Sequence, residues 1–284
     1  MNANLVYSSS YLFCVAAFIC AIPLYAMLRR NSPEMACHRY GKVSTTFFNR
    51  ADILGILFFL GIYGWYLTLA QAPPELNPDG SVREIKITPP VVATQMISQI
   101  VPGIIVLALL MFRNVDLVQL FGLKSKNSRY LIVIAPIGVI LAFLTYFALQ
   151  IGGYFEFLEQ TFGKELKEQE AVRVYKESSG ATIRVLLAVS VCVIAPFIEE
   201  LVFRGYIYSA TKRFSDRLFA TLFSSLFFAL VHFNINAILP LFILAIILVI
   251  AYEITGSLWA PISIHALFNI SNLVLMELDK TPGN

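Results

Sequence analysis

Charged residues are scarce in this sequence of 284 residues. Asp, Glu, Lys and Arg make up 14% of it, hydrophobic residues make up 58%, and the mean hydropathy is +0.73. A soluble domain carries roughly 25% charged and 45–50% apolar residues, so this composition leaves too little polar surface to face water. The net charge of +3 is also modest. Because nucleic-acid binding needs a contiguous basic face, we predict no nucleic-acid partner.

The cysteines of this sequence show no paired spacing of the kind that marks a metal site or a disulfide framework. The four cysteines are Cys14, Cys20, Cys37 and Cys192, and three of them lie inside apolar runs. We interpret them as small buried residues rather than functional thiols.

The N-terminal apolar stretch 11–28 has no basic residue before it, and Arg29 and Arg30 follow it instead. A secretory signal peptide has the opposite polarity, with its basic residues first. The pattern therefore predicts a retained membrane span.

Long apolar runs are what the sequence has in abundance. Eight segments approach the ~20 residues that a helix needs to cross the hydrocarbon core. The predicted fold class is therefore all-α, a polytopic protein of the lipid bilayer with about eight transmembrane helices. We expect the fifth to continue as helix beyond the bilayer core, and the sixth and seventh to be short. The predicted spans are 10–28, 52–71, 91–112, 130–151, 181–204, 218–233, 238–254 and 258–277.

Basic residues are concentrated in alternate connections between these spans. The first, third and fifth connections are rich in Lys and Arg, whereas the second has only Arg83 and Lys86 and the fourth is mainly acidic. Positively charged loops stay on the cytoplasmic side. The odd connections are therefore predicted to be cytoplasmic, in a multi-pass protein of the bacterial cytoplasmic (inner) membrane.

The fourth connection has an amphipathic pattern. Leu158, Phe162 and Leu166 recur every four positions among charged residues, which indicates a helix with one apolar face. We expect it to lie on the membrane surface before the fifth span. The chain is thus divided into transmembrane helices 1–4 (residues 1–154), an amphipathic interfacial segment (155–180) and transmembrane helices 5–8 (181–284).

Polar side chains gather in the last four spans, while the first four carry almost none. A charged side chain at mid-membrane costs on the order of 2.5–3.5 kcal/mol on the mildest scale, so several together indicate a functional site. Those in or beside the last four spans are Glu199, Glu200, Arg204, His232, Glu253, His265 and Asn269.

The spacing of these residues predicts how they share helix faces. Glu200 and Arg204 are four residues apart and can pair on one face, while Glu199 is rotated by about 100° to a different surface. His265 and Asn269 are also four apart, so an imidazole and an amide project together, as oxyanion stabilisation requires.

In order, the motifs are Glu-Glu-x-x-x-Arg (199–204), Phe-x-x-x-His (228–232) and His-x-x-x-Asn (265–269). This ordered triple resembles the type II CAAX prenyl endopeptidase family, which includes the Ras-converting enzymes and bacterial abortive-infection or bacteriocin-processing proteins. The preceding run Gly-Ser-Leu-x-x-Pro-Ile (256–262) is similar to that family as well. The resemblance covers about residues 165–275.

The resemblance implies a membrane-embedded, glutamate-dependent endopeptidase whose catalytic helices are 5–8. Glu199 would be the general base and would hold a water together with His232. The oxyanion would be stabilised by His265 and Asn269. The site would be braced by Glu200 and Arg204. No cofactor is required in this reading.

A zinc-dependent reading stays open, with Glu199, His232 and His265 as three ligands and one open position. We prefer the metal-free reading because no helix carries His-Glu-x-x-His.

Two other classes of protein share some of these features. Intramembrane acids also serve transporters as proton relays, but transporters usually repeat their broken helices in both halves, and here the polar residues occupy one half. A non-catalytic immunity or binding protein of the same fold is the other alternative. For the enzyme, we expect a membrane-associated peptide or protein as substrate.

Overall fold

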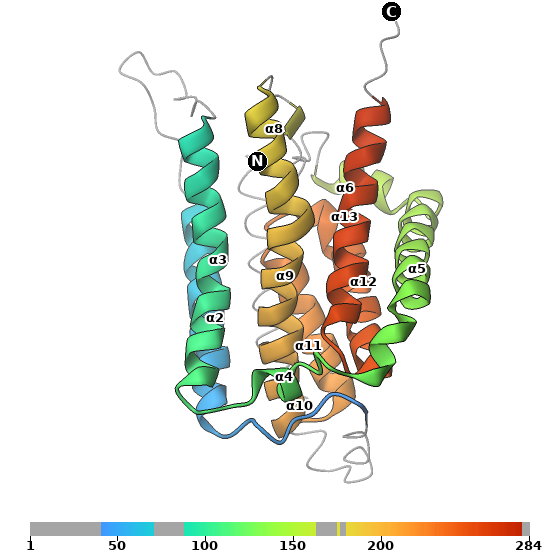
Figure 1. Cartoon of the computed structure of the whole chain (residues 1–284). Helices are drawn as coiled ribbons and strands as arrows, with labels where there is room; N and C mark the ends of the chain where they lie inside the picture. The colour runs from blue at the N-terminus through green and yellow to red at the C-terminus, as the bar shows by residue number, and fades with distance from the viewer. Residues whose placement is uncertain (1–40, 71–87, 163–174, 177–179, 280–284) are drawn as a thin grey trace, which may run out of the picture.

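The computed structural model describes residues 41–70, 88–162, 175–176 and 180–279, and its regular elements are all helical (Figure 1). The predicted first span, 10–28, lies outside the described residues. The longer helices are α2 (Ala51–Ala70), α3 (Pro89–Met111), α5 (Leu131–Ile151), α8 (Ala181–Val189), α11 (Arg217–Leu230), α12 (Ile235–Thr255) and α13 (Trp259–Asp279). Shorter ones are α4 (Leu117–Leu120), the 3-10 helix Lys126–Tyr130, α6 (Tyr154–Phe162), α9 (Ala195–Glu200) and α10 (Ser209–Phe214).

The all-helical, polytopic membrane architecture is confirmed. Within the described residues, five helical segments are long and apolar enough to cross a membrane. Two shorter apolar helices, Ala51–Tyr66 and Arg217–Leu230, coincide with the predicted second and sixth spans. The five long segments are Pro89–Met111, Leu131–Ile151, Ala181–Phe214, Ile235–Thr255 and Trp259–Asp279.

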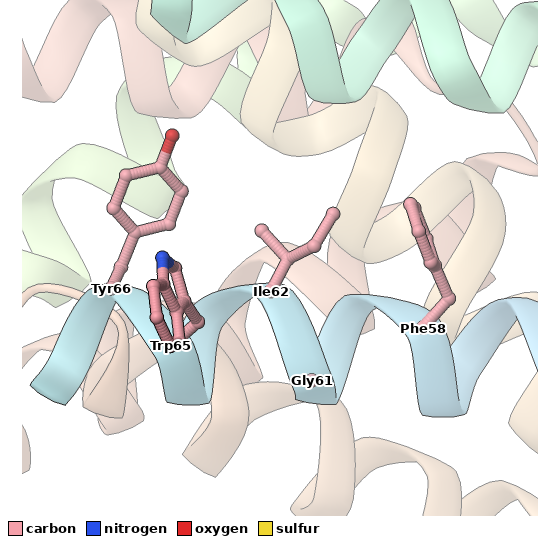
Figure 2. Close-up of a pocket in the computed structure, with 5 residues that line it drawn as sticks. All are labelled: Phe58, Gly61, Ile62, Trp65 and Tyr66. Carbon is pink, nitrogen blue, oxygen red and sulfur yellow. The ribbon is translucent and has the colours of Figure 1, made fainter.

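Large apolar side chains cover the outside of the bundle, as a lipid-facing surface requires. Ile132 is 82% exposed and Trp65 is 65% exposed. On α2 the outward residues Phe58, Gly61, Ile62, Trp65 and Tyr66 line an open hollow of about 610 Å³ (Figure 2). A water-facing protein would bury these rings.

The longest helical segment, Ala181–Phe214, is not regular. Two π-helical stretches, Ser190–Ile194 and Leu201–Tyr208, flank α9 on either side. Such wide turns are rare and are frequent at functional sites. The predicted continuation of the fifth span beyond residue 204 is confirmed, whereas the widened turns were not anticipated.

The predicted sixth and seventh spans need a correction. The sixth was expected to run to residue 233, but α11 ends at Leu230, and the chain reverses before Asn234 caps α12. The seventh is not short, because α12 has 21 residues. His232 therefore lies in a turn and not on a helix.

The main core surrounds the second π-helical stretch. Phe203 contacts Tyr63, Phe227 and Phe228 in aromatic pairs, and Tyr206 is buried against α2. A second core joins α5 to α12 and α13. These two cores fix the positions of the helices that carry the polar motifs.

The connections before α2, after α3 and between α12 and α13 meet at one end of the bundle, shown at the bottom in Figure 1. Arg113 donates to the Phe47 carbonyl and to Asp52, and the Leu258 backbone N–H donates to the Phe121 carbonyl. The shared end agrees with the predicted alternation. That it faces the cytoplasm stays a prediction.

The amphipathic segment is described in part. Residues Tyr154–Phe162 are helical, and Leu158 on its apolar face is 5% exposed. Leu166 lies outside the described residues. The tyrosine at the helix start, Tyr154, donates a hydrogen bond to the Ile235 carbonyl at 3.4 Å, so α6 lies against the α11–α12 turn.

Candidate active site

The structure brings Glu199 together with two histidines. The Oε2 atom of Glu199 lies 3.9 Å from Nε2 of His232 and 3.9 Å from Nε2 of His265. These residues come from α9, the α11–α12 turn and α13. The convergence that the three motifs predicted is therefore present, within the 10 Å that a shared site requires.

The tautomer of His232 follows from its partner. Its Nδ1 atom lies 2.7 Å from the Phe228 carbonyl oxygen. A carbonyl only accepts hydrogen bonds, so Nδ1 carries the hydrogen and Nε2 of the neutral ring carries a lone pair. That lone pair faces Glu199.

His265 is oriented in the same way by a carboxylate. Its Nδ1 atom lies 2.9 Å from Oε1 of Glu200, which also accepts a 2.8 Å hydrogen bond from Arg204. Because Arg204 donates to this oxygen, the oxygen is an acceptor, so Nδ1 of His265 donates and Nε2 of the neutral ring again presents a lone pair. Sequence reasoning gave Glu200 a bracing role with Arg204 and missed this contact, because residues 200 and 265 are on different helices.

Arg204 is held from three sides. Besides Glu200, its guanidinium donates to the Ala245 carbonyl at 3.3 Å and lies 4.4 Å from the centroid of the Phe228 ring. The side chain is 1% exposed and Glu200 is fully buried. The predicted pair is therefore present as a buried, hydrogen-bonded ion pair.

Phe228 is the residue of the second motif to which sequence reasoning gave no role. Its ring contacts both imidazoles, with centroid distances of 4.7 Å to His232 and 5.8 Å to His265. The same ring lies over Arg204. The recurrence of an aromatic residue four positions before a histidine was the only available signal.

Three hydrogen-bond acceptors thus converge on one point. Nε2 of His232, Nε2 of His265 and Oε2 of Glu199 all present lone pairs, and Oε2 is buried without a hydrogen-bond partner among the described residues. Leaving buried acceptors unpaired is costly. The arrangement fits a group that donates hydrogens or carries positive charge, such as water, a proton or a cation.

Asn269 is engaged differently from the prediction. Its amide donates to the Val191 carbonyl at 2.8 Å. In the first π-helical stretch the Ala195 N–H bonds back to the Ser190 carbonyl, five residues earlier. By the same five-residue spacing, the N–H of residue 196 would donate to the Val191 carbonyl, but residue 196 is proline and has no N–H. Asn269 therefore satisfies a carbonyl that Pro196 leaves unpaired, and it retains a second amide hydrogen.

The donor types of the three converging residues suit zinc, but their spacing is wide. Zinc bonds of about 2.0–2.2 Å place tetrahedral ligand atoms about 3.4 Å apart, compared with 3.9 Å here. Within the described residues, no group of three metal-ligating side chains is close enough to hold an ion. Zinc binding would require the side chains to move together.

Glu253, another acid of these spans, belongs to a separate cluster. Its Oε1 atom accepts hydrogen bonds from Lys212 at 2.5 Å and from Tyr208 at 2.6 Å. Lys212 also donates to the Val43 carbonyl at 3.3 Å. All three side chains are buried, so this cluster ties the segment before α2 to α10 and α12.

Comparison with known proteins gives the same family as the motifs. Residues 181–271 match the family described as type II CAAX prenyl endopeptidase Rce1-like. Over 137 residues the chain is 26% identical to a Bacillus subtilis (strain 168) protein named "Putative membrane peptidase YdiL", covering 48% of this chain and 54% of that protein. The chain thus spans about half the length of the curated relative it matches. No solved structure matches the chain. The resemblance carried by the three motifs is confirmed for residues 181–271.

Proposed function

We propose that this multi-pass membrane protein is an intramembrane endopeptidase that hydrolyses a peptide bond of a membrane-associated peptide or protein. The observation that carries this proposal is the buried, unpartnered Oε2 atom of Glu199 at 3.9 Å from two imidazole nitrogens. Such a set of acceptors suits a bound water. The match of residues 181–271 to an endopeptidase family supports the reaction class, and the bacterial relative supports a bacterial inner membrane location.

In the proposed reaction, a water donates its hydrogens to Glu199 and His232. Glu199 takes one proton as the water oxygen attacks the substrate carbonyl, so a new C–O bond forms and negative charge moves to the carbonyl oxygen. The proton then passes to the amide nitrogen as the C–N bond breaks. The site holds this charge in a water-poor interior, where electrostatic effects are strong.

His265 is the proposed donor to the oxyanion: it donates from Nε2 after accepting a proton there, while its Nδ1 atom stays bonded to Oε1 of Glu200 at 2.9 Å. The second amide hydrogen of Asn269 supports a shared role in oxyanion binding. Glu200 and Arg204 act on the reaction through the orientation of His265.

The transporter alternative has less support. The polar side chains gather at one point between α9, α11 and α13, whereas a transporter needs a relay that reaches both faces of the membrane. A non-catalytic immunity protein would not require three acceptors to be left unsatisfied.

Comparative membrane proteomics tests the proposal. Cells expressing the wild-type chain are compared with cells expressing Glu199→Ala at equal protein levels. We expect at least one membrane protein to lose a defined fragment in the variant, with the new terminus inside or next to a membrane segment. Identical terminal peptides in both cells would count against a peptidase.

A further inference from the structure

A cavity with both polar and apolar lining lies between α3 and the first π-helical stretch, and Glu199 does not line it. Its volume is about 260 Å³. The side chains that line it are Val92, Gln95, Met96, Ser98, Gln99, Leu187, Ser190 and Val191. None of them is used by the chemistry proposed above.

The cavity is unusual because it places amides at membrane depth. Gln95 and Gln99 lie roughly 9 Å and 15 Å from the start of α3 at 1.5 Å per residue, within a hydrocarbon core of about 30 Å. Gln95 is exposed and Gln99 is half-buried, beside outward apolar side chains such as Ile97, 66% exposed, and Ile104, 57% exposed. Polar groups facing hydrocarbon without partners cost free energy, so their gathering in a cavity indicates a ligand.

One of these amides is fixed in place. Ser190 is buried and donates a 2.9 Å hydrogen bond to Oε1 of Gln99. This bond occupies Oε1 of Gln99, and the amide nitrogen of Gln99 has no hydrogen-bond partner among the described residues. Gln95 likewise has no side-chain partner among them. The cavity therefore offers amide donors and acceptors together.

We propose that this cavity binds the backbone of the substrate in an extended conformation. A transmembrane helix satisfies its own N–H and C=O groups, so a peptidase must unwind the helix before it can attack a carbonyl. Unwinding leaves these groups unpaired in a medium without water. The amides of Gln95 and Gln99 supply the complementary donors and acceptors, whatever the substrate's side chains.

The cavity is joined to the reacting residues by one contact. Val191 lines the cavity, and its carbonyl accepts from Asn269, one helical turn from His265. Ser190 is nine residues before Glu199, or about 13 Å along the helix. An extended chain rises about 3.3 Å per residue, so the cavity binds the substrate about four residues from the cleaved bond.

This inference rests on the proposed function, and its test separates the two. The probe is a palmitoylated, fluorescent dodecapeptide of alanine and valine in phosphatidylglycerol–phosphatidylcholine vesicles. A matched probe carries N-methyl groups on alternate backbone nitrogens, which removes hydrogen-bond donors and keeps the side chains. Binding is measured by fluorescence anisotropy to Glu199→Gln protein, which avoids turnover.

We expect N-methylation to weaken binding to Glu199→Gln protein about tenfold, since each hydrogen bond contributes about 1 kcal/mol. In protein that also carries Gln95→Leu and Gln99→Leu, the two probes should bind within about twofold of each other. Thr94→Val is the matched control, because Thr94 is on the same helix but bonds to its own helix at the Pro90 carbonyl.

Equal effects of N-methylation with and without the glutamines would overturn the inference. If Gln99→Leu lowers the melting temperature, the two probes are compared on protein that carries Gln95→Leu alone. The Gln95 side chain has no hydrogen-bond partner to lose among the described residues. Glutamine-dependent binding of a probe that wild-type protein never hydrolyses would support this inference and contradict the proposed function. Hydrolysis of the probe by wild-type protein, with binding that does not depend on the glutamines, would support the proposed function and contradict this inference.

Discussion

Two glutamates of the membrane-spanning helices, Glu199 on α9 and Glu253 on α12, have different surroundings. Glu253 accepts hydrogen bonds at its Oε1 atom from Lys212 at 2.5 Å and from Tyr208 at 2.6 Å, while its Oε2 atom is buried without a partner among the described residues. Glu199 instead points an unpartnered oxygen at two imidazoles, each 3.9 Å away. The first arrangement neutralises a charge and joins segments that are far apart in sequence. The arrangement around Glu199 leaves hydrogen-bond acceptors unpaired where a small molecule can bind. The Glu199 side chain is also partly accessible, because it is 23% exposed.

This difference teaches that the presence of an intramembrane acid is a weak indicator of catalysis. Burying either acid costs free energy. What separates them is that Lys212 forms an ion pair with Glu253, whereas the Oε2 atom of Glu199 faces two imidazoles at 3.9 Å. The predictions below test this contrast, beginning with the largest expected effect.

Glu199→Gln should slow hydrolysis by roughly 10²–10⁴-fold, the usual contribution of a general base, with little change in melting temperature. The amide keeps the shape of the side chain but cannot take a proton. Turnover of the peptide identified by proteomics is measured in proteoliposomes. Glu253→Gln is the control, and its folded fraction should hydrolyse the same peptide at nearly the wild-type rate. Comparable rate losses in both variants would remove the distinction between the two glutamates.

Lys212→Met should destabilise the protein by about 3–5 kcal/mol, because it removes the cation that compensates the buried Glu253 and leaves only the Tyr208 hydroxyl at its Oε1 atom. Adding Glu253→Gln should recover much of that loss, since no charge is then left without a partner. Thermal unfolding in detergent measures both variants. A double variant less stable than Lys212→Met would show that the two residues stabilise the protein independently.

Arg204→Lys should lower stability by about 2 kcal/mol and reduce the rate of hydrolysis. Lysine retains the charge but cannot bond to Glu200 and the Ala245 carbonyl in the same plane, and His265 would lose part of its orientation. Melting and turnover are measured together, with the exposed Arg213→Lys as control. An unchanged melting temperature would indicate that the guanidinium binds substrate instead of bracing the site.

Asn269→Leu should lower the free energy of unfolding by about 1–2 kcal/mol, because the Val191 carbonyl loses the hydrogen bond from the Asn269 amide. In a Pro196→Ala background the restored N–H can bond to that carbonyl, so the same substitution should cost less. The four proteins form a thermodynamic cycle measured by thermal unfolding. If activity falls much further than stability in both backgrounds, the amide also acts on the oxyanion.

Chelation is expected to have the smallest effect. If Glu199 and His232 activate water without a metal, dialysis against a strong chelator leaves the rate unchanged. Activity lost on dialysis and restored specifically by zinc would overturn the metal-free mechanism and assign Glu199, His232 and His265 as ligands.

Much of this protein could be predicted from its sequence. The mean hydropathy and run lengths determine a polytopic helical protein, because only helices satisfy every backbone group in lipid along one chain segment. The i,i+4 spacing of Glu200 and Arg204 determined their pairing for the same local reason. The ordered motifs also identified the family over residues 181–271.

Only the tertiary structure decided how the motifs share their partners. The contact of Glu200 with His265 and the bond from Asn269 to Val191 join helices whose rotations depend on packing. The end of α11 before His232 and the π-helical stretches around α9 also escaped prediction, since hydropathy measures burial and not helical register. Periodicity fixes which residues share a face of one helix, but the lone pairs that converge on Glu199 depend on how three helices pack together.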